Sequence, residues 1–337
     1  MHKASFFQKA AHQAVICSLC PHHCRIQPNE YGICGTRQNV DGELVAKSFG
    51  KLTALYPDPI EKKPLYHFYP GSHILSLGSF GCNLRCLFCQ NHQISQAQNT
   101  DVFSYSCYEP GDVVQRAGGL KDNTGIAYTY NEPVVNYEFV TETANLAREQ
   151  GLKNVVVSNG VINSAPMERW LELIDAFNID LKAFDDDFYP QIARGSLDPV
   201  LRSLKAIASH HIHLEITHLV VPGLNDSIKP FREMVKWIAG ELGQATPLHI
   251  SRYFPAYHFM QEDPTSLDIL MKFYEEARLH LSYVFPGNIG ISQGWADTRC
   301  PICNSLVIER AGFQAKIRDA TPDGKCAGCQ TEIFTNS

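Results

Sequence analysis

Cysteine is the residue type in this 337-residue chain whose placement could do chemistry. Cys107 stands alone, and the other cysteines fall in three tight groups, which we name N-terminal, central and C-terminal. In that order the groups are Cys17, Cys20, Cys24 and Cys34; Cys82, Cys86 and Cys89; and Cys300, Cys303, Cys326 and Cys329. Disulfide frameworks belong to oxidising compartments and to small domains with insufficient cores. In a chain of this length, clustered thiols instead indicate metal binding.

The central group reads C-x3-C-x2-C and directly follows a strand expected over residues 74–80. Three thiolates leave one iron of a [4Fe–4S] cube without a protein ligand, and an open position is what separates a reactive metal site from a closed structural one. A zinc site that borrows a fourth ligand such as His92 is the alternative. Zinc sites usually pair cysteines as C-x2-C, so the spacing favours the cluster.

The two outer groups each offer four thiolates, enough to close a metal site. The C-terminal group consists of two C-x2-C pairs that flank a short strand-like stretch, which predicts a zinc-ribbon-like module with structural zinc. The N-terminal group fits either a zinc ion or an auxiliary iron–sulfur cluster. We favour a structural metal there, because nothing nearby suggests an open coordination position.

Alternating strands and helices must position these groups. The expected strands are residues 74–80, 125–130, 154–158, 177–181, 212–220 and 248–253. The expected helices are residues 133–150, 167–176, 199–209, 231–242 and 266–280. This alternation predicts βαβ units and a parallel sheet, in either an open doubly wound arrangement or a full or partial barrel. In all of these folds, ligands gather at the carboxyl ends of the strands.

Composition narrows the function classes. Hydrophobic residues make up 44% of the chain and charged residues 19%, as in an ordinary soluble globular protein. The net charge of −6 argues against binding to nucleic acid through its phosphates. No apolar run approaches the length of a membrane span, and the first residues lack the apolar core of a secretory signal. We therefore expect a cytoplasmic protein that binds neither nucleic acid nor membrane.

The central motif, with Phe88 before its last cysteine, resembles the radical SAM superfamily. The resemblance implies an α/β fold, a partial (β/α)6 TIM-like barrel, over residues 71–297. A cysteine-rich metal-binding segment (residues 1–70) would precede this core, and the zinc-ribbon-like tail (residues 298–337) would follow it. In that superfamily the open iron is chelated by S-adenosylmethionine. One electron, from a donor such as flavodoxin or ferredoxin, then cleaves this cofactor to a 5′-deoxyadenosyl radical that abstracts hydrogen from a substrate.

Three turns after the expected strands match, by their order along the chain, turns that bind the cofactor in this superfamily. Residues 130–133 stand where the family has a Gly-Gly-Glu-Pro turn, although both glycines are absent here. Residues 158–160 resemble its Thr-Asn-Gly turn, and residues 180–182 resemble the Asp-Leu-Lys of glycyl-radical activases. The resemblance thus implies cofactor contacts at Asn131, Glu132, Ser158, Asn159, Asp180 and Lys182.

Further segments resemble a narrower family, the AmmeMemoRadiSam-system radical SAM enzymes, which are relatives of the pyruvate formate-lyase activating enzymes. The segments are residues 58–71, 221–226, 249–255 and 283–288. This resemblance implies Memo-like and AMMECR-like partners but specifies no substrate. Arg252 and His258 are candidates for the substrate pocket.

Two alternatives stay open. The first is a glycyl-radical activase that acts on a protein partner. Activases, however, carry an arginine in the strand before Val-Val-Pro-Gly, which residues 217–223 of this chain lack. The second is a non-catalytic scaffold in which all three cysteine groups bind zinc.

Overall fold

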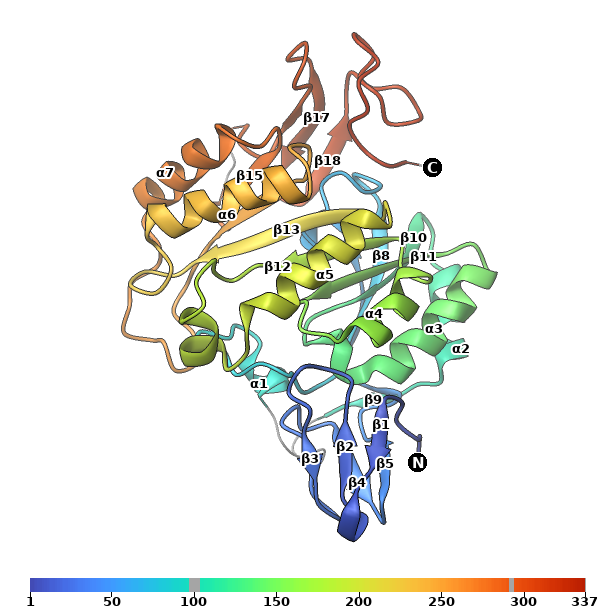
Figure 1. Cartoon of the computed structure of the whole chain (residues 1–337). Helices are drawn as coiled ribbons and strands as arrows, with labels where there is room; N and C mark the ends of the chain where they lie inside the picture. The colour runs from blue at the N-terminus through green and yellow to red at the C-terminus, as the bar shows by residue number, and fades with distance from the viewer. Residues whose placement is uncertain (97–103, 291–293, 337) are drawn as a thin grey trace.

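The computed structural model describes residues 1–96, 104–290 and 294–336. At its centre lies an eight-stranded sheet in the order β15-β14-β13-β12-β11-β10-β8-β7 (Figure 1). Its strands are β7 (Ala54–Pro59), β8 (His73–Gly78), β10 (Asn123–Tyr128), β11 (Lys153–Ser158), β12 (Ala176–Asp180), β13 (His213–Val220), β14 (Leu248–Arg252) and β15 (Val284–Gly287).

All neighbouring strands from β8 to β15 are parallel, and β7 lies antiparallel to β8 at one edge. A helix follows each parallel strand before the next one begins. These helices are α2 (Pro110–Gly118), α3 (Tyr137–Glu149), α4 (Ser164–Leu171), α5 (Leu197–Ser209), α6 (Ile228–Glu241) and α7 (Leu267–Arg278). The prediction of an α/β fold with a mainly parallel sheet is confirmed. The edge strands β7 and β15 and the helix α2 were not predicted.

The helices form where apolar residues recur at helical spacing. In α6, Phe231, Met234, Val235 and Ile238 are buried on one face. In α7, the hydroxyl of Ser266 accepts a hydrogen bond from the Ile269 backbone N–H and caps the first turn. Among the described residues, no helix is both long and apolar enough to cross a membrane.

The segment between β7 and β8 closes the amino end of the sheet. After the short helix η2 (Ile60–Lys62), the backbone N–H groups of Tyr66 and His67 donate to the carboxylate of Glu215 on β13, at 2.9 and 2.7 Å. Burial raises the pKa of Glu215, but hydrogen bonds from His213 and His249 hold it well below its usual value. A buried anion with these partners fixes the segment under the sheet. We call residues 59–69 the floor segment.

Small sheets flank the large one at both ends of the chain. Figure 1 shows the N-terminal strands and the C-terminal strands at opposite ends of the molecule. The N-terminal strands are β1 (Phe7–Lys9), β2 (Val15–Cys17) and β3 (Arg25–Ile26), then β4 (Arg37–Val40) and β5 (Glu43–Ala46). The C-terminal strands are β16 (Thr298–Arg299), β17 (Leu306–Ala311) and β18 (Gln314–Ile317). The remaining elements are β6 (Lys51–Leu52), β9 (Ser106–Cys107), α1 (His92–Ser95), η1 (Ala11–Gln13), η4 (Pro133–Asn136) and η5 (Tyr189–Ala193).

Candidate functional site

A cavity of about 390 Å³ lies at the carboxyl ends of the parallel strands. This is where ligands bind in α/β folds of this kind. The cavity brings together the central cysteines and the residues expected from three separate turns. Its lining includes Cys82, Cys86, Cys89, Asn131, Glu132, Ser158, Asn159, Asp180 and Lys182.

The central cysteines come from the loop that follows β8, and their surroundings fit an iron–sulfur cluster. The sulfur of Cys82 accepts a hydrogen bond from the Leu84 N–H at 3.3 Å, and the Asn159 side-chain amide lies 3.7 Å from it. Such donors to sulfur are typical of cluster ligands. Among the described residues, the three central sulfurs do not all lie within 4.8 Å of one another.

Burial governs the protonation of these thiols. It raises the pKa of Cys86 to about 11 and that of Cys82 well above the usual value. Without a metal both side chains are neutral near pH 7, because a buried thiolate is poorly solvated. Metal binding must therefore release these protons.

Glu132 joins two of the turns that line the cavity. Its buried carboxylate accepts hydrogen bonds from the Val134 N–H at 3.0 Å and the Ser158 hydroxyl at 2.7 Å through one oxygen. The other oxygen accepts from the Asn159 N–H at 2.8 Å. Burial raises the pKa of Glu132, although these three donors oppose it. One carboxylate thus holds the turn after β10 against the turn after β11.

Two asparagines extend this connection to the cysteine loop. The Asn131 side chain accepts from the Ser79 N–H at 2.8 Å and donates to the Gly81 carbonyl at 3.0 Å, just before Cys82. The Asn159 side chain donates to the Asn83 side-chain oxygen at 2.9 Å, just after Cys82. The backbone around the first central cysteine is therefore fixed from both sides.

Asp180 and Lys182 form an ion pair at the carboxyl end of β12, with 2.8 Å between Nζ and Oδ2. Burial lowers the pKa of Lys182, but Asp180 and Cys86 outweigh it and hold the pKa above its usual value. The lysine is therefore positively charged beside the central group. This charge opposes the effect of burial on the pKa of Cys86.

Two lysines that sequence reasoning missed also line the cavity, and both come from the floor segment. The ammonium groups of Lys62 and Lys63 bind the two carboxylate oxygens of Asp58, at 2.8 and 2.7 Å. The Tyr130 hydroxyl donates to the same carboxylate, and the Lys63 ammonium lies 4.5 Å from the centre of the Tyr130 ring. The sequence signal was a pair of adjacent lysines between prolines.

The last strands contribute different residues from those expected. Neither Arg252 nor His258 is among the described residues that line the cavity, whereas Ser251 and Asn288 are. The Nε of Arg252 donates to the Thr265 carbonyl at 2.7 Å. Successive side chains of a strand point to opposite faces, so Ser251 faces the cavity and Arg252 does not.

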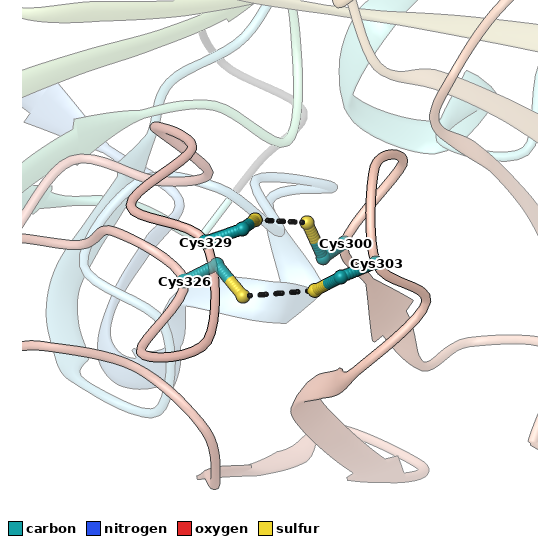
Figure 2. A group of neighbouring side chains, drawn as sticks. All are labelled: Cys300, Cys303, Cys326 and Cys329. Atoms are coloured by element: carbon teal, nitrogen blue, oxygen red, sulfur yellow. Dashed lines mark hydrogen bonds between the residues drawn. The ribbon is translucent and has the colours of Figure 1, made fainter.

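The C-terminal group forms a compact four-sulfur site, shown in Figure 2. All four sulfurs lie within 4.8 Å of one another, with 3.4 Å between Cys300 and Cys329 and 3.5 Å between Cys303 and Cys326. A tetrahedral zinc ion with bonds of about 2.3 Å would separate its sulfurs by about 3.8 Å. A hydrogen bond with Ser305 lowers the pKa of Cys303 to about 6, which favours the thiolate that a metal needs. The spacing fits a single ion.

The N-terminal group surrounds a second, smaller cavity. Cys17, Cys20 and Cys34 are buried, and Cys24 is partly exposed. Burial raises the pKa of Cys20 to about 12. The other residues that line this cavity are mainly aliphatic: Leu19, Ile26, Ile33, Val134 and Val135. Within the described part of the chain, no three of these sulfurs lie within 4.8 Å of one another.

Comparison with known proteins agrees with the geometry. A family model described as the radical SAM superfamily matches residues 77–238. An uncharacterized protein of Methanocaldococcus jannaschii is 41% identical over 340 residues, which cover 99% of each chain. The pyruvate formate-lyase-activating enzyme of Clostridium pasteurianum is 26% identical over 165 residues, which cover 47% of this chain and 66% of that enzyme.

A solved structure shares the fold at low sequence identity. It is that of Streptococcus suis SuiB bound to S-adenosylmethionine, with a TM-score of 0.51 and 13% identity. The match covers 64% of this chain and 52% of SuiB. At this identity the likeness extends to the α/β fold alone.

Proposed function

The chain belongs to the radical SAM superfamily and is related to the pyruvate formate-lyase activating enzymes, and from this we propose that the cavity is its active site. When bound, a [4Fe–4S] cluster and S-adenosylmethionine supply the reductive cleavage that generates a 5′-deoxyadenosyl radical for hydrogen abstraction. The observation that carries the proposal is the cavity, which gathers all three central cysteines with polar residues from three strand ends.

The residues of the chain have distinct roles in this proposal. Cys82, Cys86 and Cys89 hold the cluster. Glu132 holds the amino group of S-adenosylmethionine and positions the turns on either side of it, because its carboxylate already connects them. Lys182 places a positive charge next to the cysteines. The opposite wall, with Lys62 and its neighbours, is left for the substrate.

Within the superfamily we assign the chain to the AmmeMemoRadiSam-system branch. The quoted segments of the sequence support this assignment, and the floor segment that presents two lysines to the cavity is one of them. The assignment brings Memo-like and AMMECR-like proteins as partners, and a flavodoxin or ferredoxin as electron donor. We also assign zinc to the C-terminal group, which the close spacing of its sulfurs supports.

We further propose that the protein is cytoplasmic. We also propose that it has three functional parts: residues 1–70, a core of residues 71–297, and a tail of residues 298–337. The strand β7 joins the first part to the core, because it pairs with β8 along its whole length.

The test is anaerobic turnover. Protein reconstituted with iron and sulfide and reduced with dithionite should convert S-adenosylmethionine to 5′-deoxyadenosine and methionine. The Cys86→Ala variant should lose this activity, because three thiolates are the ligand set that leaves one iron open. Cys107→Ala is the matched control, since Cys107 is exposed and lies outside the three groups.

The outcome that rules out the proposal is equally concrete. It is a wild-type protein with a complete cluster that yields neither 5′-deoxyadenosine nor methionine. Zinc without iron in anaerobically purified protein would instead support the scaffold.

A further inference from the structure

We propose that the N-terminal group binds a second iron–sulfur cluster next to the central group, rather than a single zinc ion. Its four cysteines come from the end of β2 and from the turns around β3 and before β4. The sequence favoured a structural metal there, because nothing nearby suggested an open coordination position. The geometry of the sulfurs and their surroundings changes that preference.

The spacing of the sulfurs separates the three cysteine groups into two kinds. The C-terminal sulfurs all lie within 4.8 Å of one another, as the ligands of one tetrahedral zinc ion do. Within the described residues, neither the N-terminal nor the central sulfurs reach that spacing. The central group is the one assigned to a [4Fe–4S] cluster, whose ligands sit on the corners of a cube. In this respect the N-terminal group differs from the zinc-like site of the same chain.

The surroundings of the N-terminal group are those of a buried cluster. The Arg37 guanidinium donates to the Cys17 sulfur at 3.4 Å, and the Thr36 hydroxyl, which donates to the Val135 carbonyl at 3.0 Å, lies 3.4 Å from the Cys34 sulfur. Apart from Arg37, Asn83 and Gly32, aliphatic side chains line the remainder of the cavity. Hydrogen bonds to sulfur and exclusion of solvent are the means by which proteins tune iron–sulfur clusters. The buried Arg37 guanidinium also forms an ion pair with the Glu138 carboxylate, so its positive charge lies between that carboxylate and the Cys17 sulfur.

Direct contacts connect this site to the central loop. Gly81, which precedes Cys82, has a φ of 81°, and a Cβ there would lie 2.5 Å from the carbonyl oxygen of Cys34. Only glycine permits the two backbones to approach this closely. On the other side of Cys82, the Asn83 carbonyl oxygen lies 2.7 Å from Nε2 of His22, and the Asn83 side chain lines the N-terminal cavity.

These contacts imply a role in electron transfer, an implication that rests on the proposed function. Four cysteine ligands close the coordination of a [4Fe–4S] cluster, which leaves no iron free for a substrate. One electron would pass from the reduced N-terminal cluster to the central cluster, with no bond made or broken. An external one-electron donor such as a ferredoxin would then reduce the N-terminal cluster again.

The test uses the full chain with Cys82, Cys86 and Cys89 all changed to alanine. After anaerobic reconstitution, we expect about eight irons per chain in the wild type and about four in this triple variant, with matching sulfide and a [4Fe–4S] Mössbauer signature. Adding Cys24→Ser to the triple variant should remove most of the remaining iron. Adding Cys107→Ala instead should leave it in place, which controls for loss of any cysteine.

A triple variant that holds zinc at two sites and almost no iron overturns the proposal. Electron paramagnetic resonance tests the proximity of the clusters. The signal of the reduced wild type should be broadened by interaction between the clusters, and the triple variant should give a narrow signal. A wild-type spectrum that equals the sum of two independent clusters refutes their adjacency. The iron count of the triple variant depends on the N-terminal group alone, whereas 5′-deoxyadenosine formation by the wild type tests the proposed function.

Discussion

Replacement of Glu132 by glutamine tests how the cavity is built. The carboxylate accepts three hydrogen bonds: two at one oxygen, from Val134 and Ser158, and one at the other, from the Asn159 N–H. Glutamine keeps one acceptor oxygen and replaces the other by an NH2 group. If its oxygen stays with Val134 and Ser158, the NH2 group faces the Asn159 N–H, donor against donor.

The expected magnitude follows from that unpaired donor. A buried N–H without a partner costs about 1–3 kcal/mol, so the free energy of unfolding should fall by that amount. The variant can relieve this cost by moving the turn that carries Asn159. Binding of S-adenosylmethionine would then have to restore the turn. This weakens the affinity about 5-fold if the turn costs about 1 kcal/mol and about 150-fold if it costs about 3 kcal/mol. If Glu132 holds the amino group of the cofactor as we propose, loss of that charged contact adds to this.

Two measurements check the expectation. Anaerobic calorimetry gives the affinity for S-adenosylmethionine, and urea unfolding followed by tryptophan fluorescence gives the stability. Ser158→Ala is the matched comparison, because it leaves the carboxylate in place. It removes the hydroxyl that donates to Glu132 and accepts from the Gly160 N–H, at a cost of about 1–3 kcal/mol. The reasoning is refuted if Glu132→Gln binds the cofactor as tightly as the wild type and unfolds at the same urea concentration.

Three further predictions concern stability and metal content. Asp58→Asn leaves the buried Lys63 ammonium without its closest carboxylate, and the free energy of unfolding measured in urea should fall by about 3–5 kcal/mol. Lys63→Met leaves Asp58 paired with Lys62 and should lower it by less than about 1.5 kcal/mol. Equal losses in the two variants would contradict this. Burial lowers the pKa of His218 to about 4, so the folded protein binds this proton less readily than the unfolded chain does. The contribution of neutral His218 to the free energy of unfolding is therefore complete above the unfolded pKa near 6.5, and it is lost as the pH falls toward 4. Between pH 6.5 and about pH 5, the free energy of unfolding should therefore fall by about 1.5 kcal/mol less in His218→Met than in the wild type. The same dependence on pH in both proteins would refute this. Chelation of zinc from the C-terminal group should make residues 298–336 sensitive to protease without loss of iron, and joint loss of both metals would oppose separate sites.

Sequence periodicity predicted the inner strands well and the edge strands poorly. The inner strand β11 contains the apolar run Val155–Val157, as expected of a parallel strand buried on both faces, whereas β13 alternates apolar with polar residues. The edge strand β7 contains Pro57 and Pro59, and β15 contains Pro286. Proline has no backbone N–H to donate to a neighbouring strand and is tolerated mainly in edge strands. Because proline in a sequence ordinarily argues against a strand, these two edge strands were missed.

The cavity could be predicted where it depends on the order of turns along the chain. Glu132, Asn159 and Lys182 all follow parallel strands, whose carboxyl ends meet at one edge of the sheet. Lys63 could not be placed in this way, because it reaches the cavity from a segment at the opposite end of the strands. Adjacent lysines are ordinarily solvated, and only the long-range packing of the floor segment buries this one at 2% side-chain exposure.

The floor segment also connects the C-terminal module to the cavity. The Arg310 guanidinium, on β17, donates to the Tyr66 carbonyl, and the backbone of Thr335 pairs with His67 and Tyr69 on both sides of Phe68. The same segment presents Lys63 to the cavity. A metal bound by the C-terminal group would therefore also order the floor segment, which we propose faces the substrate, although Figure 1 shows the C-terminal strands far from the N-terminal ones. The N-terminal group, by contrast, contacts the loop of the central cysteines itself. The two outer groups thus adjoin the same cavity in different ways: the C-terminal module contacts the floor segment, and the N-terminal group contacts the loop of the central cysteines.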